Sequence, residues 1–150
     1  MHTDFLIMRE ENAIDLPLPK RHTMAAAGMD LHANVYEPIC IKKGSRCLIP
    51  TGIKVALPFG YEAQIRPRSG LALKHGITVL NTPGTVDADY RGELKVLLVN
   101  LGEDDFIVNR GDRVAQLMIA KVEMAEFTLV DSLPDSPRGD GGYGSTGVTS

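Results

Sequence analysis

Alternation of apolar and polar residues with a period of two is the feature that most constrains the fold of this chain. Residues 53–57 read Ile-Lys-Val-Ala-Leu, and residues 61–66 read Tyr-Glu-Ala-Gln-Ile-Arg. Successive side chains of a strand point to opposite faces, so this pattern is typical of strands with one buried face. Two richer apolar runs, 94–99 and 114–119, indicate strands that are more fully buried. Because Gly, Pro and Asn separate these segments at short intervals, the sequence predicts an all-β sandwich or barrel.

The remaining elements follow from the same patterns. Further strands are expected over Phe5–Met8, Met29–Ala33, Arg46–Ile49, Ile77–Leu80 and Glu126–Val130. The segment 69–76 has a hydroxyl residue for an N-cap, basic residues in its last turn and a terminal glycine, which together predict one short helix. We expect a single β domain over residues 1–130 and a flexible C-terminal arm over residues 131–150, marked by prolines and glycines.

Composition narrows the function. The net charge of −3 and the lack of a basic run argue against nucleic-acid binding. No apolar stretch is long enough to span a bilayer, and the first residues do not resemble a signal peptide, so a cytoplasmic protein without a membrane partner is expected. Cys40 and Cys47 are then expected to be free thiols, and together with the scattered histidines they form no metal-ligand set.

The C-terminal segment RGDGGYGSTG, residues 138–147, carries groups that suit a nucleotide. Five of its ten residues are glycine, so it has little to bury. Arg138 is suited to phosphate, Tyr143 to a base, and Ser145 and Thr146 to further phosphate oxygens. A flexible tail without a ligand is the alternative interpretation.

Two internal segments carry further candidate groups. At 67–70 the sequence PRSG begins the expected helix, where free main-chain amides favour phosphate; an ordinary capped helix with a surface arginine is the alternative. Residues 81–93 are long for a hairpin connection and include Asn81, Asp87, Asp89, Tyr90 and Arg91. A carboxylate beside an aromatic ring could activate water next to a stacked sugar or base, whereas a solvated turn is the alternative.

Polar residues also stand within apolar strands. Asp30 lies between apolar neighbours, where an unpaired carboxylate is costly, so it either contacts the shell of a metal ion or pairs with nearby arginines. Arg113 and Gln116 interrupt the apolar run near residue 114. Buried polar groups need partners, so each belongs either to a core network or to a ligand site.

Taken in order, five segments resemble the motifs of the trimeric deoxyuridine triphosphatases (dUTPases). They are AGMDLHA (27–33), PRSGLALK (67–74), GTVDADYRGE (84–93), GDRVAQL (111–117) and RGDGGYGSTG (138–147). The resemblance implies a jelly-roll-like β subunit in a homotrimer whose active sites are shared between subunits. It implies hydrolysis of dUTP to dUMP and pyrophosphate, with Mg²⁺ held mainly by the substrate phosphates. That reaction limits uracil incorporation into DNA and supplies dUMP for thymidylate synthesis.

The resemblance also implies roles for single residues. Asp87 corresponds to the general base that activates the attacking water, Tyr90 packs on deoxyribose, and Asp30 reaches Mg²⁺ only through water. The remaining substrate-binding residues implied are Arg68, Ser69, Gly70, Gln116 and Arg138 for the phosphates, Asn81, Thr85, Val86 and Lys95 around uracil, and Tyr143, Gly144, Ser145 and Thr146 in the closing arm.

The sequence departs mildly from the family motifs at three positions. Tyr143 stands where phenylalanine is usual, which keeps an aromatic face and adds a hydroxyl, and Met29 and Val86 are apolar variants. A dCTP deaminase of the same fold would need an acid–base group at the pyrimidine ring rather than at the α-phosphate. A non-catalytic nucleotide-binding regulator is expected to lack Asp87 or the arm, and this sequence has both.

Overall fold

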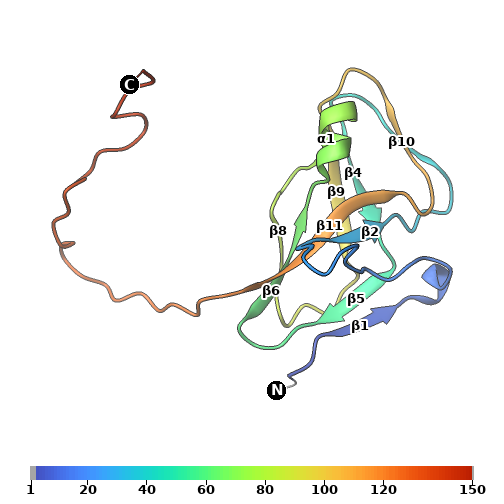
Figure 1. The fold of residues 1–150 in the computed structure, drawn as a ribbon, viewed down its shortest axis with the longest axis horizontal. Coiled ribbons are helices and arrows are strands. Elements are labelled where there is room, and N and C mark those ends of the chain that lie inside the picture. The colour runs from blue at the N-terminus through green and yellow to red at the C-terminus, as the bar shows by residue number, and fades with distance from the viewer. Residues whose placement is uncertain (1–2, 150) are drawn as a thin grey trace.

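The computed structural model describes residues 3–149 and is built almost entirely of β-strands (Figure 1). The strands are β1 (Leu6–Arg9), β2 (Met29–His32), β3 (Ile39–Ile41), β4 (Arg46–Pro50), β5 (Ile53–Ala56), β6 (Tyr61–Arg66), β7 (Ile77–Val79), β8 (Gly84–Val86), β9 (Lys95–Asn100), β10 (Phe106–Val108) and β11 (Arg113–Lys121). A 3₁₀ turn, η1 (Glu11–Ala13), and an α-helix, α1 (Ser69–His75), complete the regular structure of that part of the chain. No helix within residues 3–149 is long and apolar enough to cross a membrane. The all-β prediction with one short helix is confirmed.

Small antiparallel sheets form the body of the molecule. The largest has the strand order β2-β11-β6-β8, the next has the order β4-β9-β7, and β1 pairs with β5 as β10 pairs with β3. Strand β11 pairs with β2 through its first half and with β6 through its second half. Gln116 therefore lies opposite Asp30 on one side and opposite Arg66 on the other. This pairing brings three segments that are distant in sequence onto one sheet.

The core follows the alternation seen in the sequence. In β9 the side chains of Val96 and Leu98 are buried while Lys95 is exposed, and β6 buries Ala63 and Ile65. Burying one such aliphatic side chain contributes about 1.5–3 kcal/mol. The largest fully buried side chains include Leu31, Ile41, Ile49, Ile77, Leu94, Leu98 and Val108. They hold the sheets together beneath the loops that carry the candidate site residues.

The segment 81–93 is more ordered than the sequence indicated. Strands β7 and β9 pair antiparallel, as expected for a hairpin, but β8 lies within the connection and pairs with β6 of the other sheet. Since β8 spans Gly84–Val86, the free part of the loop is confined to two short stretches, 80–83 and 87–94. The connection therefore joins the two larger sheets and is held at both ends.

The short helix begins one residue differently from the prediction. Ser69 is the first residue of α1, and Arg68 occupies the N-cap position in extended conformation without a side-chain capping hydrogen bond. The predicted hydroxyl cap is wrong, because the Ser69 backbone is already helical. The C-terminus agrees with the sequence: Gly76 has φ 65° and its N–H donates to the carbonyl of Ala72.

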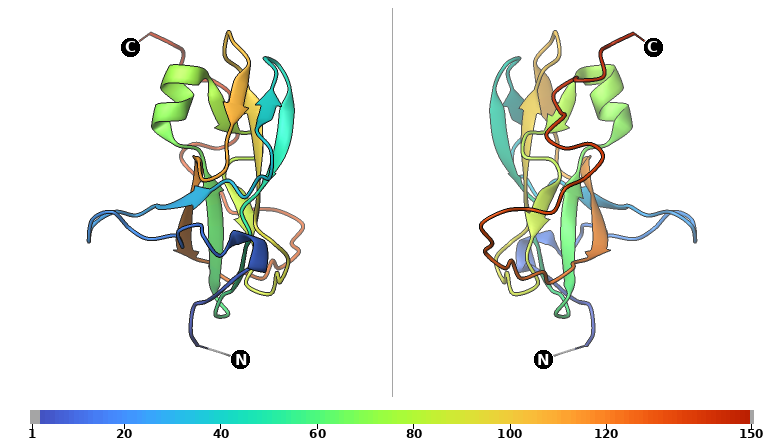
Figure 2. Two further views of the ribbon diagram at one scale, coloured as in Figure 1. Left: turned by 90° about the vertical axis from the view of Figure 1, so that its right-hand side faces the viewer. Right: turned by 90° about the vertical axis from the view of Figure 1, so that its left-hand side faces the viewer.

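Beyond β11 the chain leaves the body as an extended arm (Figures 1 and 2). Residues 122–149 contain no helix or strand. The strand predicted over Glu126–Val130 is therefore wrong: this stretch has no sheet partner, and the side chains of Phe127 and Leu129 are 100% and 97% exposed. Apolar alternation indicates an extended chain but does not supply a neighbour to pair with. The domain boundary at residue 131 stays a prediction.

Candidate active site

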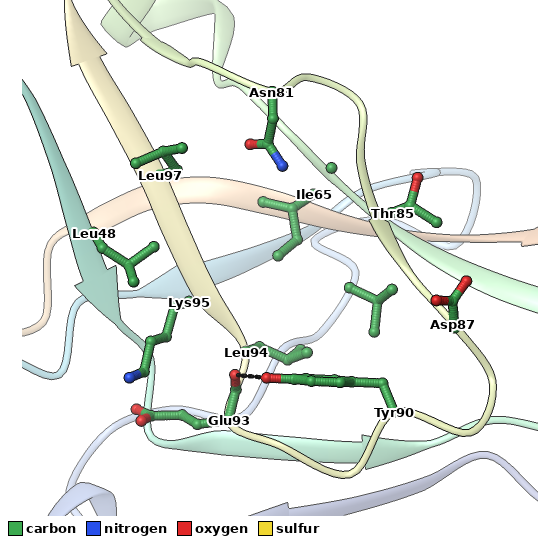
Figure 3. Close-up of a pocket in the computed structure, with 12 residues that line it drawn as sticks. Leu48, Ile65, Asn81, Thr85, Asp87, Tyr90, Glu93, Leu94, Lys95 and Leu97 are labelled. Carbon is green, nitrogen blue, oxygen red and sulfur yellow. Dashed lines mark hydrogen bonds between the residues drawn. The ribbon is translucent and has the colours of Figure 1, made fainter.

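A pocket of about 340 Å³ lies beside the loop between β7 and β9 (Figure 3). Six of the residues predicted for the site line it: Asn81, Thr85, Val86, Asp87, Tyr90 and Lys95. The sequence placed five of them in the connection 81–93 and Lys95 in the strand that follows, and the structure brings all six around one cavity.

One wall of the pocket is apolar and the opposite edge is polar. Leu48 of β4, Ile65 of β6 and Leu97 of β9 form the apolar wall, as Figure 3 shows. Leu48 lies opposite Leu97 in the β4–β9 pair, so both reach the pocket from one sheet. Asn81 and Thr85 contribute an amide and a hydroxyl. A concave site with an apolar wall and few polar groups suits a flat heterocycle.

Asp87 and Tyr90 leave the same tight turn. The N–H of Tyr90 donates to the carbonyl of Asp87 at 3.1 Å. The guanidinium of Arg91 donates to the carbonyls of Ala88 at 2.7 Å and Tyr90 at 3.1 Å. Arg91 therefore fastens the loop internally, and the carboxylate of Asp87 remains exposed at the pocket.

The ring of Tyr90 lies back across the loop rather than out into solvent (Figure 3). Its hydroxyl donates to the main-chain carbonyl of Glu93 at 3.0 Å. The side chain is 45% exposed, so one face remains open to a ligand. The carboxylate of Glu93 in turn accepts a hydrogen bond from the N–H of Gly52 at 2.8 Å.

A second group of candidate residues surrounds Asp30 on β2. One carboxylate oxygen lies 2.7 Å from Nε2 of His22 and 3.5 Å from Nη1 of Arg113, and the other lies 3.3 Å from Nε of Arg68. Burial raises the pKa of Asp30, but the hydrogen bond to His22 and the charges of Arg68 and Arg113 outweigh it and hold the pKa below its usual value. The contacts with Arg68 and Arg113 agree with the second of the two roles expected for Asp30, and contact with the shell of a metal ion stays a prediction.

Gln116 belongs to the same group. Its amide donates to the carbonyl of Pro67 at 2.9 Å, just before α1. A Cβ at Gly28 would lie 2.0 Å from Oε1 of Gln116, so the carboxamide needs a glycine there. Arg68 also donates to the carbonyl of Arg113 at 3.2 Å. Gln116 and Arg68 are thus oriented by the strand pairing, while Ser69 and Gly70 lie exposed beside them.

The arm residues form a third group. Arg138 donates to the carbonyl of Gly141 at 2.7 Å, and the N–H of Ser145 donates to the carbonyl of Gly142 at 3.1 Å. Tyr143 is fully exposed and has φ 50°, in the left-handed region. None of Arg138, Tyr143, Gly144, Ser145 and Thr146 lines the pocket beside the hairpin. The structure therefore does not unite the three groups within one chain.

The described residues do not form a cluster of metal ligands. Among residues 3–149 no three His, Cys, Asp or Glu side chains gather into a group that could hold a metal ion. Cys40 and Cys47 are free thiols, as predicted. Asp30 is a single carboxylate whose side chain is 14% exposed. This fits Mg²⁺ that is ligated chiefly by substrate oxygens and water, because Mg²⁺ commonly retains several waters and binds phosphates.

Sequence reasoning missed several residues that build the site. His22 contacts Asp30, and Gly28 leaves the space that the side chain of Gln116 occupies. Gly92 and Glu93 contact the ring and the hydroxyl of Tyr90, and Leu48 supplies part of the apolar wall. Their contacts are formed between segments distant in sequence or depend on the absence of a side chain. Gly28, two residues before Asp30 in AGMDL, was the one available signal of a close approach.

The fold and the pocket define an all-β protein with a concave, partly apolar pocket at the connection between β7 and β9. The family profile described as dUTPase matches residues 15–147, and the chain belongs to the dUTPase family. It is 56% identical over 142 residues to the deoxyuridine 5'-triphosphate nucleotidohydrolase of Caulobacter vibrioides, covering 93% of this chain and 92% of that protein. It is 62% identical over 131 residues to the enzyme of that name from Treponema denticola, covering 87% and 91%.

Solved structures support the fold. The dUTPase of Staphylococcus bacteriophage 80alpha with dUPNHPP superposes with a TM-score of 0.86 at 23% identity, covering 98% of this chain and 100% of that one. A dUTPase mutant of phage phi11 of S. aureus, described with a coordinated structural Mg(II) ion, superposes with a TM-score of 0.76 at 22% identity, covering 89% and 100%. The jelly-roll-like β fold expected from the motifs is confirmed.

Proposed function

We propose that this chain hydrolyses dUTP to dUMP and pyrophosphate. Membership of the dUTPase family and the relatives at 56% and 62% identity support this activity. The observation that carries the proposal is the pocket in which an exposed carboxylate (Asp87), an aromatic ring (Tyr90) and an amide (Asn81) face one cavity. A pocket of this kind offers a proton acceptor for the attacking water, an aromatic ring on which the sugar can pack, and polar groups that can bind a pyrimidine.

We infer that the choice of substrate would follow from the polar groups and the shape of the pocket. Uracil would lie against the hairpin, with Asn81 and the main chain around Thr85, Val86 and Lys95 matching its acceptor–donor–acceptor edge. Cytosine presents a different pattern and would leave polar groups unpaired, which discriminates by roughly 10⁴-fold. Close packing of uracil against the loop would leave no space for the methyl group of thymine, and Tyr90 packed on the sugar would exclude a 2′-hydroxyl.

The reaction needs one base and a well-held triphosphate. Asp87 would accept a proton from a water molecule as that water attacks the α-phosphorus in line. The bond between the α-phosphorus and the oxygen that bridges to the β-phosphate would then break, and pyrophosphate would leave. Arg68, Gln116 and Arg138, with the main chain at Ser69 and Gly70, would hold the phosphates. Positioning of these groups supplies most of the catalytic effect.

Mg²⁺ is proposed as the metal ion. When bound to the triphosphate it neutralises charge that develops on the phosphate oxygens. The carboxylate of Asp30 would contact its water shell, and Arg68 and Arg113 hold that carboxylate in place. The structural Mg(II) ion described for the phage phi11 dUTPase mutant is consistent with a metal in this fold.

A homotrimer with shared active sites is proposed as the working form. Two observations support it. The phosphate-binding candidates Arg68, Gln116 and Arg138 do not line the pocket that holds Asp87 in the same chain. The extended arm also leaves Phe127 and Leu129 with no partner inside the described chain, which favours contacts with another copy. Each site would combine the hairpin pocket, the Arg68–Gln116 group and the arm from different subunits, with Tyr143, Gly144, Ser145 and Thr146 closing over uracil and phosphate.

In the cell, this activity would limit uracil incorporation into DNA and supply dUMP for thymidylate synthesis, and we propose the cytoplasm as its location.

The test of the proposed activity measures pyrophosphate release from dUTP, dTTP, dCTP and UTP with and without Mg²⁺. Rapid Mg²⁺-dependent release from dUTP alone supports the proposal. Release of ammonia from dCTP would instead identify a deaminase, and binding without turnover would identify a non-catalytic regulator.

A further inference from the structure

We propose that Gly92 is a positioning residue that sets the place of the Tyr90 ring and thereby the discrimination between deoxyribose and ribose. The inference rests on the proposed hydrolysis of dUTP, and deepens it by naming what holds the ring where the sugar must pack. The resemblance to the family motifs implied no role for Gly92, and in the proposed reaction Gly92 contacts neither the attacking water nor the substrate phosphates.

The space above Gly92 is filled by one side chain. A Cβ added at this position would lie 2.3 Å from Oη, 2.5 Å from Cζ and 3.0 Å from Cε2, all atoms of Tyr90. Contacts this short do not occur in folded proteins, so the ring would have to move. The φ of Gly92 lies outside the left-handed region that favours glycine. The glycine is therefore required for the space it leaves and not for its backbone.

The surface that receives the ring is fixed to the body of the protein. The Tyr90 hydroxyl donates to the carbonyl of Glu93, whose carboxylate accepts from the N–H of Gly52. Next along the chain, the N–H of Leu94 donates to Ile53 at 2.8 Å and its carbonyl accepts from the buried hydroxyl of Thr51 at 2.6 Å. Gly92 and Glu93 thus lie against the Tyr90 ring in a segment that hydrogen bonds attach to the body of the protein.

Displacement of the ring has a specific consequence. Because hydrogen bonds hold Glu93 and Leu94 to residues 51–53, we expect an alanine at position 92 to displace the Tyr90 ring and break its hydroxyl hydrogen bond. The lifted ring would no longer fill the place of a 2′-hydroxyl, so ribose would be excluded less strictly. A misplacement of about 1 Å in a catalytic site can reduce the rate by about 100-fold. The loss should fall on dUTP much more than on UTP.

A double-mutant cycle tests this inference. We would measure kcat/KM for dUTP and UTP in wild type, Gly92→Ala, Tyr90→Ala and the double variant, with a thermal melt of each. We expect Gly92→Ala to lower kcat/KM for dUTP by about 10- to 100-fold and to narrow the dUTP/UTP ratio. In the Tyr90→Ala background the same change should have almost no effect, because the ring it displaces is gone.

Either of two results would overturn the inference: an unchanged dUTP/UTP ratio in Gly92→Ala, or an equal loss in the Tyr90→Ala background. A readout that does not depend on activity is the NMR contact between the α-protons of Gly92 and the ring protons of Tyr90 in the wild type. Its absence contradicts the geometry. Failure of wild type to release pyrophosphate from dUTP would instead refute the proposed function, and the NMR contact would still decide where the ring lies.

Discussion

The N–H of Tyr90 donates to the carbonyl of Asp87 across a single turn, at 3.1 Å. The proposed base and the proposed sugar platform are therefore not independent side chains on a flexible loop. Arg91 bonds to two carbonyls of the same turn, and the Tyr90 hydroxyl bonds to Glu93 at its far end. A change in this turn should disturb both water activation and sugar packing.

Asp87→Asn should abolish most turnover while the pocket keeps its shape. The amide is nearly isosteric with the carboxylate but cannot accept a proton from water, so kcat should fall by roughly 10²–10⁴-fold. Binding of dUTP, measured by calorimetry, should stay close to that of the wild type. Near-normal turnover would exclude Asp87 as the base.

Tyr90→Ala and Tyr90→Phe separate the ring from its hydroxyl. Alanine removes the surface that packs on the sugar, so activity on dUTP should fall and the dUTP/UTP ratio of kcat/KM should narrow. Phenylalanine keeps the ring and loses only the hydrogen bond to Glu93, a loss of about 0.5–1.5 kcal/mol. The effect of Phe on the ratio should therefore be the smaller one. If Ala leaves the ratio unchanged while overall activity falls, Tyr90 has only a structural role.

Asp30→Asn should weaken the hold on the phosphates. Without the carboxylate, Arg68 and Arg113 lose their shared anion, and the guanidinium of Arg68 is no longer fixed beside α1. We expect a higher KM for dUTP and a higher Mg²⁺ concentration for half-maximal rate, both from steady-state kinetics. Unchanged values for both would exclude Asp30 from the phosphate and metal site.

Acid should weaken the contact between the N-terminal segment and the body. The hydrogen bond from Arg110 lowers the pKa of Asp15 below its ordinary value of 3.8. A carboxyl whose folded pKa is depressed stabilises the fold above its unfolded pKa, and this contribution is lost as pH falls through the folded pKa. Urea unfolding should show Asp15→Asn to be less stable than wild type at pH 6, with the difference shrinking below pH 4. A difference that persists unchanged at pH 2–3 would contradict this sign.

Much of this architecture could be predicted because alternation reports which face of a strand is buried. It placed β6 and β9 and, through the motifs, grouped Asn81, Asp87 and Tyr90 in one loop. The strand predicted over Glu126–Val130 was wrong because this stretch leaves the body of the protein and no described strand lies beside it to pair with. The roles of Gly28 and Gly92 could not be predicted, since each depends on which side chain occupies the space a Cβ would fill.

We propose that the Asp87 pocket and the closing arm of one active site come from different subunits. Two inactive chains test it: Asp87→Asn with its arm intact, and a chain that keeps Asp87 but ends at Pro137. Each homotrimer should be nearly inactive, the first without a base and the second without Arg138 and Tyr143. The two chains are unfolded and reassembled together, mixed trimers are verified by mass, and pyrophosphate release from dUTP is measured. We expect activity well above that of either parent, because some sites then combine Asp87 of the truncated chain with the arm of the other. Mixed trimers as inactive as both parents would contradict it.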